Sequence, residues 1–219
     1  MAKTYTREEF IATYGPYIAR ATKGTGIFPG TVVAQAILES QGPINGVYKV
    51  GGSTLSQEAN NYFGIKCHNW NGATYNIDTR EQDPAGNDYT VNACFRAYNS
   101  VEDSINDYVN FLLSNSNYHK AGVFNADSVY SQAKALKKAG YATDVNYART
   151  LGLLYKENES YIDKYSRYGL GGIWSSFRNN PSAFVKRNKT AFIGLGVLTI
   201  SLSIGIYALV KYNKKDYVR

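Results

Sequence analysis

Thr31-Val-Val-Ala-Gln-Ala-Ile-Leu-Glu39-Ser40 is an apolar stretch that carries one carboxylate near its end. Pro29 precedes it, and proline suits the first turn of a helix because its backbone is already close to the helical conformation. Residues 41–43, Gln-Gly-Pro, follow and are typical of a helix end. Val33 and Ile37 recur at helical spacing. The pattern predicts a short core helix that organises the rest of the chain.

Glu39 shares a stripe of this helix with Val32, Gln35 and Ala36, where the buried face meets an edge. Apolar neighbours disfavour an ionised carboxylate, and so does the negative end of the helix dipole. We therefore expect a raised pKa for Glu39, and a carboxyl that stays protonated near neutral pH is suited to general acid catalysis. The alternative is a solvated glutamate that ends a core helix.

The composition is that of a globular domain with an appendage. Of the 219 residues, 44% are hydrophobic and 19% are charged, which are ordinary values for a folded chain. The 20 tyrosines are unusual. Tyrosine combines a flat apolar face with a hydroxyl and suits a sugar-binding groove, although many of these side chains also have to fill the core.

The net charge of +7 is concentrated in the C-terminal part. Residues 1–165 contain 15 basic and 16 acidic side chains, whereas residues 166–219 contain nine basic side chains and one acidic one. Because the larger part is close to neutral, binding of nucleic acid by its surface is not supported.

Residues 191–210 form an uncharged, apolar run of 20 residues, the length that a helix needs to cross a bilayer. We expect a transmembrane helix that holds the protein in a lipid bilayer, followed by a basic tail at 211–219. Residues 166–190 mix aromatic and basic side chains, which fits either a juxtamembrane segment or a plain linker. Both flanks of the run are basic, so the orientation across the membrane stays open.

Residues 1–165 are predicted to form one mainly helical domain. Thr6-Arg-Glu-Glu9 is a capping box at the start of the first helix. Residues 42–52 are rich in glycine and are expected to form a surface loop. A short helix is expected at 53–59, with Thr54 and Gln57 as its capping box. Another is expected after Ser100, and its buried face consists of Val101, Ile105, Tyr108, Val109 and Leu112. Two more are expected, one from Val129 to Gly140 and one after a cap at Thr143.

Two runs of alternating side chains predict an antiparallel hairpin. The faces are Tyr75, Ile77, Thr79 and Glu81 in the first run and Tyr89, Val91, Ala93, Phe95 and Ala97 in the second. Residues 83–88 between them have the composition of a turn. Glu81 is therefore a second carboxylate, placed near the tip of the hairpin.

Cys67 and Cys94 are the two cysteines and lie just outside the paired runs, where strand ends come within bridging distance. We expect a disulfide that ties the base of the hairpin, which fits an oxidising compartment. The alternative is two small buried residues. His68 and His119 lie far apart without a companion ligand pattern, so we expect no metal site and no cofactor.

Four stretches, in this order, resemble one family of enzymes. They are Ala34-Gln-Ala-Ile-Leu-Glu-Ser40, Asn60-Asn-Tyr-Phe-Gly-Ile-Lys66, Cys94-Phe-Arg-Ala-Tyr-Asn-Ser100 and Ala139-Gly-Tyr-Ala-Thr-Asp144. Together they resemble the bacterial and phage glucosaminidases of glycoside hydrolase family 73 over about residues 5–160. The resemblance implies an α+β, lysozyme-like fold with a small antiparallel hairpin. It also implies hydrolysis of the β-1,4 bond between N-acetylglucosamine and N-acetylmuramic acid in the glycan strands of peptidoglycan.

The resemblance implies roles for single residues as well. Glu39 matches the catalytic acid of the family, and Glu81 matches a hairpin position where many members carry a second carboxylate. Tyr141 and Tyr147 match tyrosines that line the cleft of the family, and we place Tyr141 with the catalytic residues. Asn61 and Phe63 match the substrate-side loop of the family. For Tyr147, packing in the core is the alternative.

Several alternatives stay open at this point. Asp78 and Asp83 are substitutes for Glu81, and the N-acetyl group of the substrate is able to replace a protein nucleophile altogether. Residues 41–44, Gln-Gly-Pro-Ile, stand where family members carry Trp-Gly soon after the Glu-Ser pair, so the subsite beside Glu39 is expected to differ.

Two functions are compatible with these features. The first is a peptidoglycan endo-β-N-acetylglucosaminidase, of which a phage lysis or cell-entry enzyme is one form. The second is a catalytically inactive wall-binding or virion structural module on the same fold. The expected location is a membrane, with the domain facing the bacterial cell wall or periplasm, although residues 1–9 are polar and lack the apolar core of a secretory signal.

Overall fold

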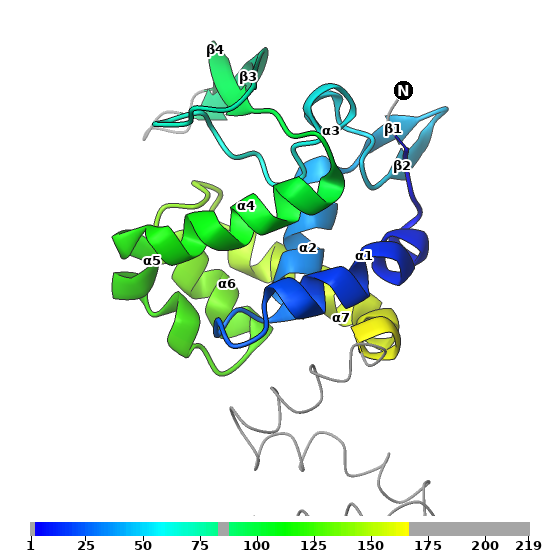
Figure 1. The fold of residues 1–219 in the computed structure, drawn as a ribbon, viewed down its shortest axis with the longest axis vertical. Coiled ribbons are helices and arrows are strands. Elements are labelled where there is room, and N and C mark those ends of the chain that lie inside the picture. Colours follow the sequence, from blue (N-terminus) through cyan, green and yellow to red (C-terminus); the bar gives the residue numbers. More distant parts are fainter. Residues whose placement is uncertain (1–2, 83–87, 167–219) are drawn as a thin grey trace, which may run out of the picture. The chain divides into compact units, whose positions relative to one another are not determined.

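The computed structural model describes residues 3–82 and 88–166. In these ranges the chain forms helices and two small antiparallel sheets of two strands each (Figure 1). The elements are, in chain order, α1 (Arg7–Ala21), α2 (Pro29–Ser40), β1 (Gly42–Ile44), β2 (Val47–Lys49), α3 (Thr54–Ala59), β3 (Thr74–Gln82), β4 (Asp88–Arg96), α4 (Val101–Ser114), α5 (Ser116–Ala121), the 3₁₀-helix η1 (Val123–Asn125), α6 (Val129–Lys138) and α7 (Tyr147–Ser166). The predicted mainly helical domain with an antiparallel hairpin is confirmed.

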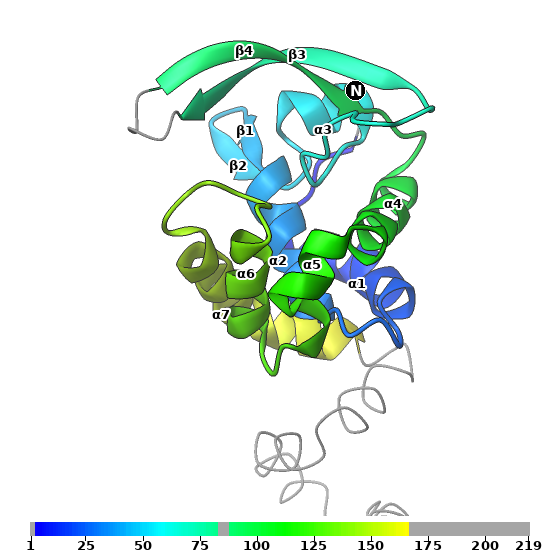
Figure 2. The ribbon, with the colours of Figure 1, turned by 90° about the vertical axis from the view of Figure 1, so that its left-hand side faces the viewer.

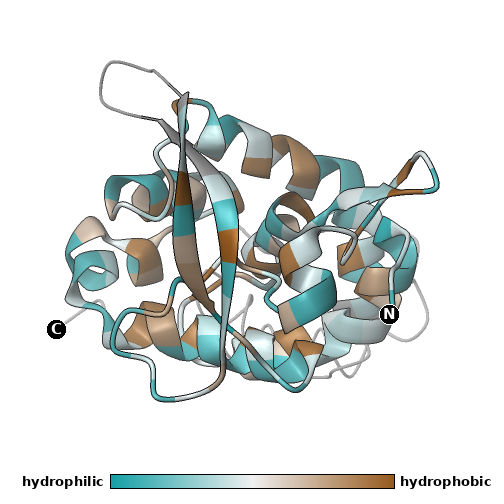
Figure 3. Ribbon diagram, turned by 90° about the horizontal axis from the view of Figure 1, so that it is seen from above, coloured by the Kyte–Doolittle hydropathy of each residue, from teal (hydrophilic) through white to brown (hydrophobic). Residues whose placement is uncertain are grey.

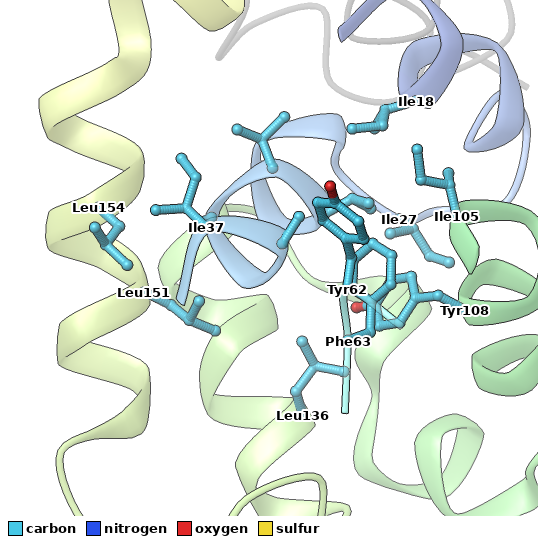
Figure 4. Close-up of a cluster of buried hydrophobic side chains, with 14 of the residues drawn as sticks. Ile18, Ile27, Ile37, Tyr62, Phe63, Ile105, Tyr108, Leu136, Leu151 and Leu154 are labelled. Atoms are coloured by element: carbon cyan, nitrogen blue, oxygen red, sulfur yellow. The ribbon is translucent and has the colours of Figure 1, made fainter. Parts of the chain in front are cut away.

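Helix α2 packs against α1, α6 and α7. Its residues 30–37 and Ser40 are buried, so nearly every face of the helix is covered. Figure 4 shows Ile37 of α2 beside Leu151 and Leu154 of α7. Burying one such aliphatic side chain stabilises a fold by roughly 1.5–3 kcal/mol. The predicted core helix is confirmed, and packing on all sides fixes the position of its last turn.

The predicted starts of α1 and α4 are confirmed by the side chains that cap them. The hydroxyl of Thr6 accepts a hydrogen bond from the backbone N–H of Glu9 (3.1 Å), and the Glu9 carboxylate accepts from the N–H of Thr6 (2.7 Å). Ser100 accepts from the N–H of Asp103 (3.1 Å). The buried residues of α4 include the whole predicted face. Capping therefore sets where these helices begin, and periodicity sets which side they bury.

The prediction of a surface loop at 42–52 is wrong, because β1 and β2 form a short hairpin there. Asn45 and Gly46 make its turn, and both have positive φ, 51° and 78°. An Asn-Gly pair favours this conformation, which matches the twist of the two strands that it joins. The Asn-Gly pair was the signal in the sequence.

Two helix starts also differ from the prediction. Helix α3 is capped by Ser53, whose hydroxyl accepts from the N–H of Ser56, and not by Thr54. Helix α7 begins at Tyr147 and not directly after Thr143, because Asp144 holds a turn between them. Its carboxylate accepts from the N–H of Asn146 (2.8 Å). Elements α5 and η1 were not predicted, since they are too short to show helical periodicity.

Strands β3 and β4 form the predicted antiparallel hairpin. Tyr75 lies opposite Phe95, Ile77 opposite Ala93, and Thr79 opposite Val91. The two predicted faces are therefore cross-strand partners. Figures 2 and 3 show this hairpin lying across the end of the domain toward which α2 runs. Residues 83–87, most of the predicted turn, lie outside the described residues.

The base of the β3–β4 hairpin is attached to its surroundings in two ways. Cys67 and Cys94 form the predicted disulfide, with their Cα atoms 5.4 Å apart. The expected position of Cys94 just outside the paired runs is wrong, because Cys94 lies within β4 opposite Asn76. Arg96, the last residue of β4, forms an ion pair with Asp107 of α4 (2.9 Å). The Arg96 guanidinium also lies over the ring of Trp70, 4.7 Å from its centroid. The ion pair holds the end of β4 against α4.

The predicted transmembrane helix at 191–210 and basic tail at 211–219 lie outside the described residues. So does the predicted linker at 166–190, apart from Ser166, where α7 ends. Among the helices of residues 3–82 and 88–166, none is long and apolar enough to cross a membrane.

Candidate active site

Glu39 occupies the last turn of α2, directly before the buried Ser40. Protein encloses most of its side chain, and part of its surface remains exposed to solvent. Burial raises the pKa of Glu39 from its ordinary value of 4.5 to about 7, and a hydrogen bond with Tyr147 acts in the opposite direction. The predicted increase is confirmed. At neutral pH a large share of the molecules therefore carries a proton here, as a general acid requires.

The loop between α3 and β3 passes close to the Glu39 carboxyl. Gly64 in this loop has a φ of +64°, and a Cβ atom there would lie 3.8 Å from Oε2 of Glu39. Asn61 holds the loop in place. Its amide nitrogen donates to the carbonyls of Ile65 (3.0 Å) and Arg96 (2.8 Å). Its amide oxygen accepts from the N–H groups of Phe63 and Ile65.

These four hydrogen bonds engage the whole amide of Asn61, which is fully buried. A side-chain amide has two donor hydrogens and one acceptor oxygen with two lone pairs, so no hydrogen-bonding group is left for a sugar. The geometry therefore favours a positioning role for Asn61 over the direct substrate contact expected from the sequence.

Phe63 is buried as well, and its ring stacks on that of Tyr108 with the centroids 4.2 Å apart. Its carbonyl accepts a hydrogen bond from the hydroxyl of Tyr141 (2.7 Å). Burial raises the pKa of Tyr141 well above its ordinary value, and the nearby Glu39 adds to the increase. Tyr141 is thus a neutral, partly exposed side chain close to the acid. Phe63 holds it there through the backbone and does not present its own ring to solvent.

Tyr147, at the start of α7, is the second tyrosine close to Glu39 and is only 2% exposed. Burial is the main cause that raises its pKa well above the ordinary value, and the charge of Glu39 contributes next. Its ring lies 6.1 Å from that of Tyr141, centroid to centroid. Tyr147 therefore packs in the core, as the alternative to a cleft-lining role expected, and it also influences the acid.

Gln35 is a candidate that the sequence analysis did not select. It is fully buried one turn before Glu39 on α2, and its amide nitrogen donates to the Tyr147 hydroxyl (2.7 Å). Its amide oxygen accepts from the Tyr108 hydroxyl. The signal was a glutamine inside an apolar helix on the stripe of Glu39, because a buried amide needs partners.

A family model described as mannosyl-glycoprotein endo-beta-N-acetylglucosaminidase matches residues 15–160, which include every residue placed around Glu39. The chain belongs to the glucosaminidase family. Peptidoglycan hydrolase FlgJ of Escherichia coli (strain K12) is 36% identical over 148 residues, which make up 67% of this chain and 45% of that protein. Exo-glucosaminidase LytG of Bacillus subtilis (strain 168) is 31% identical over 142 residues, 64% of this chain and 46% of that protein. The chain therefore spans less than half the length of these two relatives.

The glucosaminidase fold is also found in the catalytic domain of the autolysin Auto from Listeria monocytogenes. The two structures have a TM-score of 0.55 and 29% sequence identity, over 77% of this chain and 90% of that domain. This similarity supports the lysozyme-like arrangement of helices with a small antiparallel sheet.

Glu81, the expected second carboxylate, lies in β3 opposite Tyr89 of β4. Its side chain lies outside the described part of the chain. The structure therefore brings Glu39, Tyr141, Tyr147, Phe63 and Asn61 together in the helical body. It places the backbone of Glu81 on the β3–β4 hairpin of the glucosaminidase domain.

His119 takes part in local contacts. The ring nitrogen Nε2 of His119 hydrogen-bonds the carbonyl of Leu113 (2.7 Å), and its ring lies 4.4 Å from that of Phe124, centroid to centroid. Within residues 3–82 and 88–166, no group of three or more His, Cys, Asp or Glu side chains is arranged to hold a metal ion.

Proposed function

We propose that this glucosaminidase domain hydrolyses the β-1,4 bond between N-acetylglucosamine and N-acetylmuramic acid in peptidoglycan, with Glu39 as the general acid. One observation carries the proposal. Glu39 is enclosed enough to raise its pKa to about 7 and still has a solvent-exposed edge. A proton donor with these properties is able to protonate the leaving glycosidic oxygen at neutral pH.

The choice of substrate is supported by the relatives. FlgJ is a peptidoglycan hydrolase by name and LytG an exo-glucosaminidase, and the family model covers the region that carries Glu39, Tyr141 and Tyr147. The family description specifies an endo-acting glucosaminidase. We favour cleavage within glycan strands over release of sugars from the strand ends. The length of the fragments released from soluble chitooligosaccharides and from intact peptidoglycan distinguishes the two.

The second half of the mechanism has two forms. In one, Glu81 on the hairpin acts as base or nucleophile. In the other, the N-acetyl group of the substrate attacks the anomeric carbon and Glu39 is the single essential carboxylate. Tyr141, neutral and close to Glu39, then serves to orient the acetamido group or the attacking water.

The decisive experiment compares Glu39→Gln with wild type on purified peptidoglycan, measuring release of new reducing ends. Glutamine keeps the shape of the side chain and has no acidic proton, so the rate should fall roughly a hundredfold to ten-thousandfold. Glu58→Gln is the matched control, because Glu58 is an exposed glutamate on α3. Sedimentation with insoluble peptidoglycan measures binding separately. Binding by wild type without any release of reducing ends would favour the inactive wall-binding module instead.

We further propose that residues 191–210 hold the protein at a membrane with the domain on the side of the cell wall. The support is the uncharged run of 20 residues and its basic flanks. The Cys67–Cys94 disulfide also fits an oxidising compartment. A chain that ends at Ser166 should be soluble and active, whereas the full chain should partition into detergent. Partition of both chains into the aqueous phase would contradict the anchor.

A further inference from the structure

A chain of hydrogen bonds lies beneath Glu39 and links three separate helices. The hydroxyl of Tyr108, on α4, donates to Oε1 of Gln35 on α2. The amide nitrogen Nε2 of Gln35 donates to the hydroxyl oxygen of Tyr147 on α7 (2.7 Å). The hydroxyl of Tyr147 lies next to the carboxyl of Glu39, and donation toward that carboxyl lowers the pKa of Glu39. Gln35 and Tyr108 are fully buried and Tyr147 is 2% exposed, so water does not compete for these groups.

The chain has a direction. The oxygen of Tyr147 accepts the Gln35 hydrogen, so the hydrogen of Tyr147 is free to point to Glu39. In the reverse direction the Gln35 amide would be turned over, and its nitrogen would donate to Tyr108. The hydrogen of Tyr108 would then need another acceptor, and Gln35 is its one hydrogen-bond partner among the residues that the structure describes. A buried hydroxyl without an acceptor is costly, so the observed direction is the stable one.

We propose that Gln35 is a positioning residue that makes Tyr147 a hydrogen-bond donor to Glu39 and thereby keeps the catalytic proton on the carboxyl oxygen that Tyr147 does not contact. This inference rests on the proposed function of Glu39. Gln35 does not touch the substrate and acts through Tyr147 alone.

The consequence for Glu39 is a balance of two opposing influences. Burial favours the protonated carboxyl, and donation from Tyr147 favours the ionised one. A hydroxyl that already accepts a hydrogen bond is a stronger donor, because the bonds in a chain polarise one another. Gln35 therefore strengthens the influence that lowers the pKa of Glu39.

The other groups that face Glu39 do not provide this influence. Among the described residues they are Tyr108 from α4 and Tyr141 from the segment before α7, both neutral near pH 7. No charged side chain in the described part of the chain contributes to the pKa of Glu39. A pH profile should therefore respond mainly to the Gln35–Tyr147 pair.

The test is the pH dependence of kcat/KM on peptidoglycan for Gln35→Met, Tyr147→Phe and the double variant. Activity is lost as pH rises through the pKa of Glu39, because the acid must be protonated. This loss forms the alkaline limb of the pH profile. Each single variant weakens donation to the carboxylate, so the midpoint of the alkaline limb should move to higher pH by roughly half a unit to one unit. In the double variant the limb should lie where Tyr147→Phe alone places it, because Gln35 acts through that hydroxyl.

Gln132→Met is the matched control. Gln132 is also a fully buried glutamine with three hydrogen bonds to backbone groups, and it lies in α6. It should lower the melting temperature and leave the alkaline limb in place. If Gln35→Met behaves in the same way, Gln35 is merely structural and the proposal is overturned. Additive shifts in the double variant would overturn it as well.

Tyr108→Phe provides a second route if Gln35→Met does not fold. Without the Tyr108 hydroxyl the Gln35 amide is free to turn over, so the limb should again move to higher pH. An unmoved limb would contradict the proposal. Full activity of Glu39→Gln is a different result, which would overturn the proposed function itself and leave the hydrogen-bond chain of the structure unaffected.

Discussion

The two carboxylates proposed for catalysis are supported in different ways. Glu39 lies at the end of a helix whose other faces are packed, with Val32 and Ile37 fully buried. Glu81 lies in a strand of a two-stranded hairpin on which Tyr89 and Val91 are 51% and 38% exposed. The helix holds its carboxyl by close packing from several elements, whereas the hairpin relies on backbone pairing and on attachments at its base.

This difference separates two tasks. Burial around α2 determines the protonation of Glu39, which is a property of the chemical step. The hairpin carries exposed side chains, including an aromatic one, which under the proposed function are available to bind a glycan polymer that is too large to be enclosed. Changes in the helical body should therefore act on kcat, and changes in the hairpin should act mainly on KM.

The largest expected effect is the contrast between Glu39→Gln and Glu81→Gln. We expect Glu39→Gln to lower kcat roughly a hundredfold to ten-thousandfold, and Glu81→Gln to lower it at most roughly tenfold. Reducing-end release under saturating peptidoglycan measures both. Equal losses would erase the difference between the two regions and establish a mechanism with two protein carboxylates.

Removal of the disulfide acts on the hairpin. The bridge joins residues 27 positions apart. Loop-closure entropy for a loop of that length predicts that Cys67→Ser/Cys94→Ser lowers the free energy of unfolding by about 3.5 kcal/mol. Denaturant titration measures the loss, and wild type in reducing buffer should show the same loss. A fall in kcat at unchanged KM would place the effect in the helical body and contradict the division of tasks.

The pH dependence of stability probes the helical body alone. The folded protein binds a proton at Glu39 more tightly than the unfolded chain, since the pKa is about 7 instead of 4.5. Stability from this group is therefore present below pH 4.5 and is lost as pH rises toward 7. Relative to wild type, Glu39→Gln should be up to about 3 kcal/mol more stable at pH 8 and nearly equal at pH 4. Parallel stability curves for the two proteins between pH 4 and 8 would contradict the raised pKa.

The smallest expected effect concerns Asp107 in α4. It accepts from Nη1 of Arg96 through both oxygens and from the Tyr98 hydroxyl (2.6 Å). Asp107→Asn keeps the shape and removes the charge of a partly exposed pair, so the free energy of unfolding should fall by roughly 1 kcal/mol. Thermal unfolding measures it. A larger change in kcat than in stability would show that the base of the hairpin takes part in the chemical step.

Local signals in the sequence were enough for much of this fold. The Thr6 and Ser100 caps located two helix starts, alternation identified the facing sides of β3 and β4, and two cysteines close to the hairpin led to the disulfide, although Cys94 lies within β4. The apolar context of Glu39 was enough to expect its raised pKa. Each of these features depends on residues that are close in sequence or on a single pairing.

The parts that were missed depend on contacts between distant residues. Gln35 acquires its role from Tyr108 and Tyr147, which are 73 and 112 positions away. Asn61 looked like a substrate contact, and its amide is instead used by backbone groups as distant as Arg96. The β1–β2 hairpin has strands of three residues, too short for alternation to be visible.

The hydrogen-bond chain under Glu39 also bears on how this domain is inherited. Its members come from the first, middle and last thirds of the domain, so a recombination event inside the domain would separate them. A hybrid of two relatives would keep this hydrogen-bond chain only if both parents carry the same glutamine and tyrosines, whereas crossovers outside the domain leave the set intact. We therefore expect the domain to move between proteins as one piece, gaining new neighbours at its ends while its interior changes slowly.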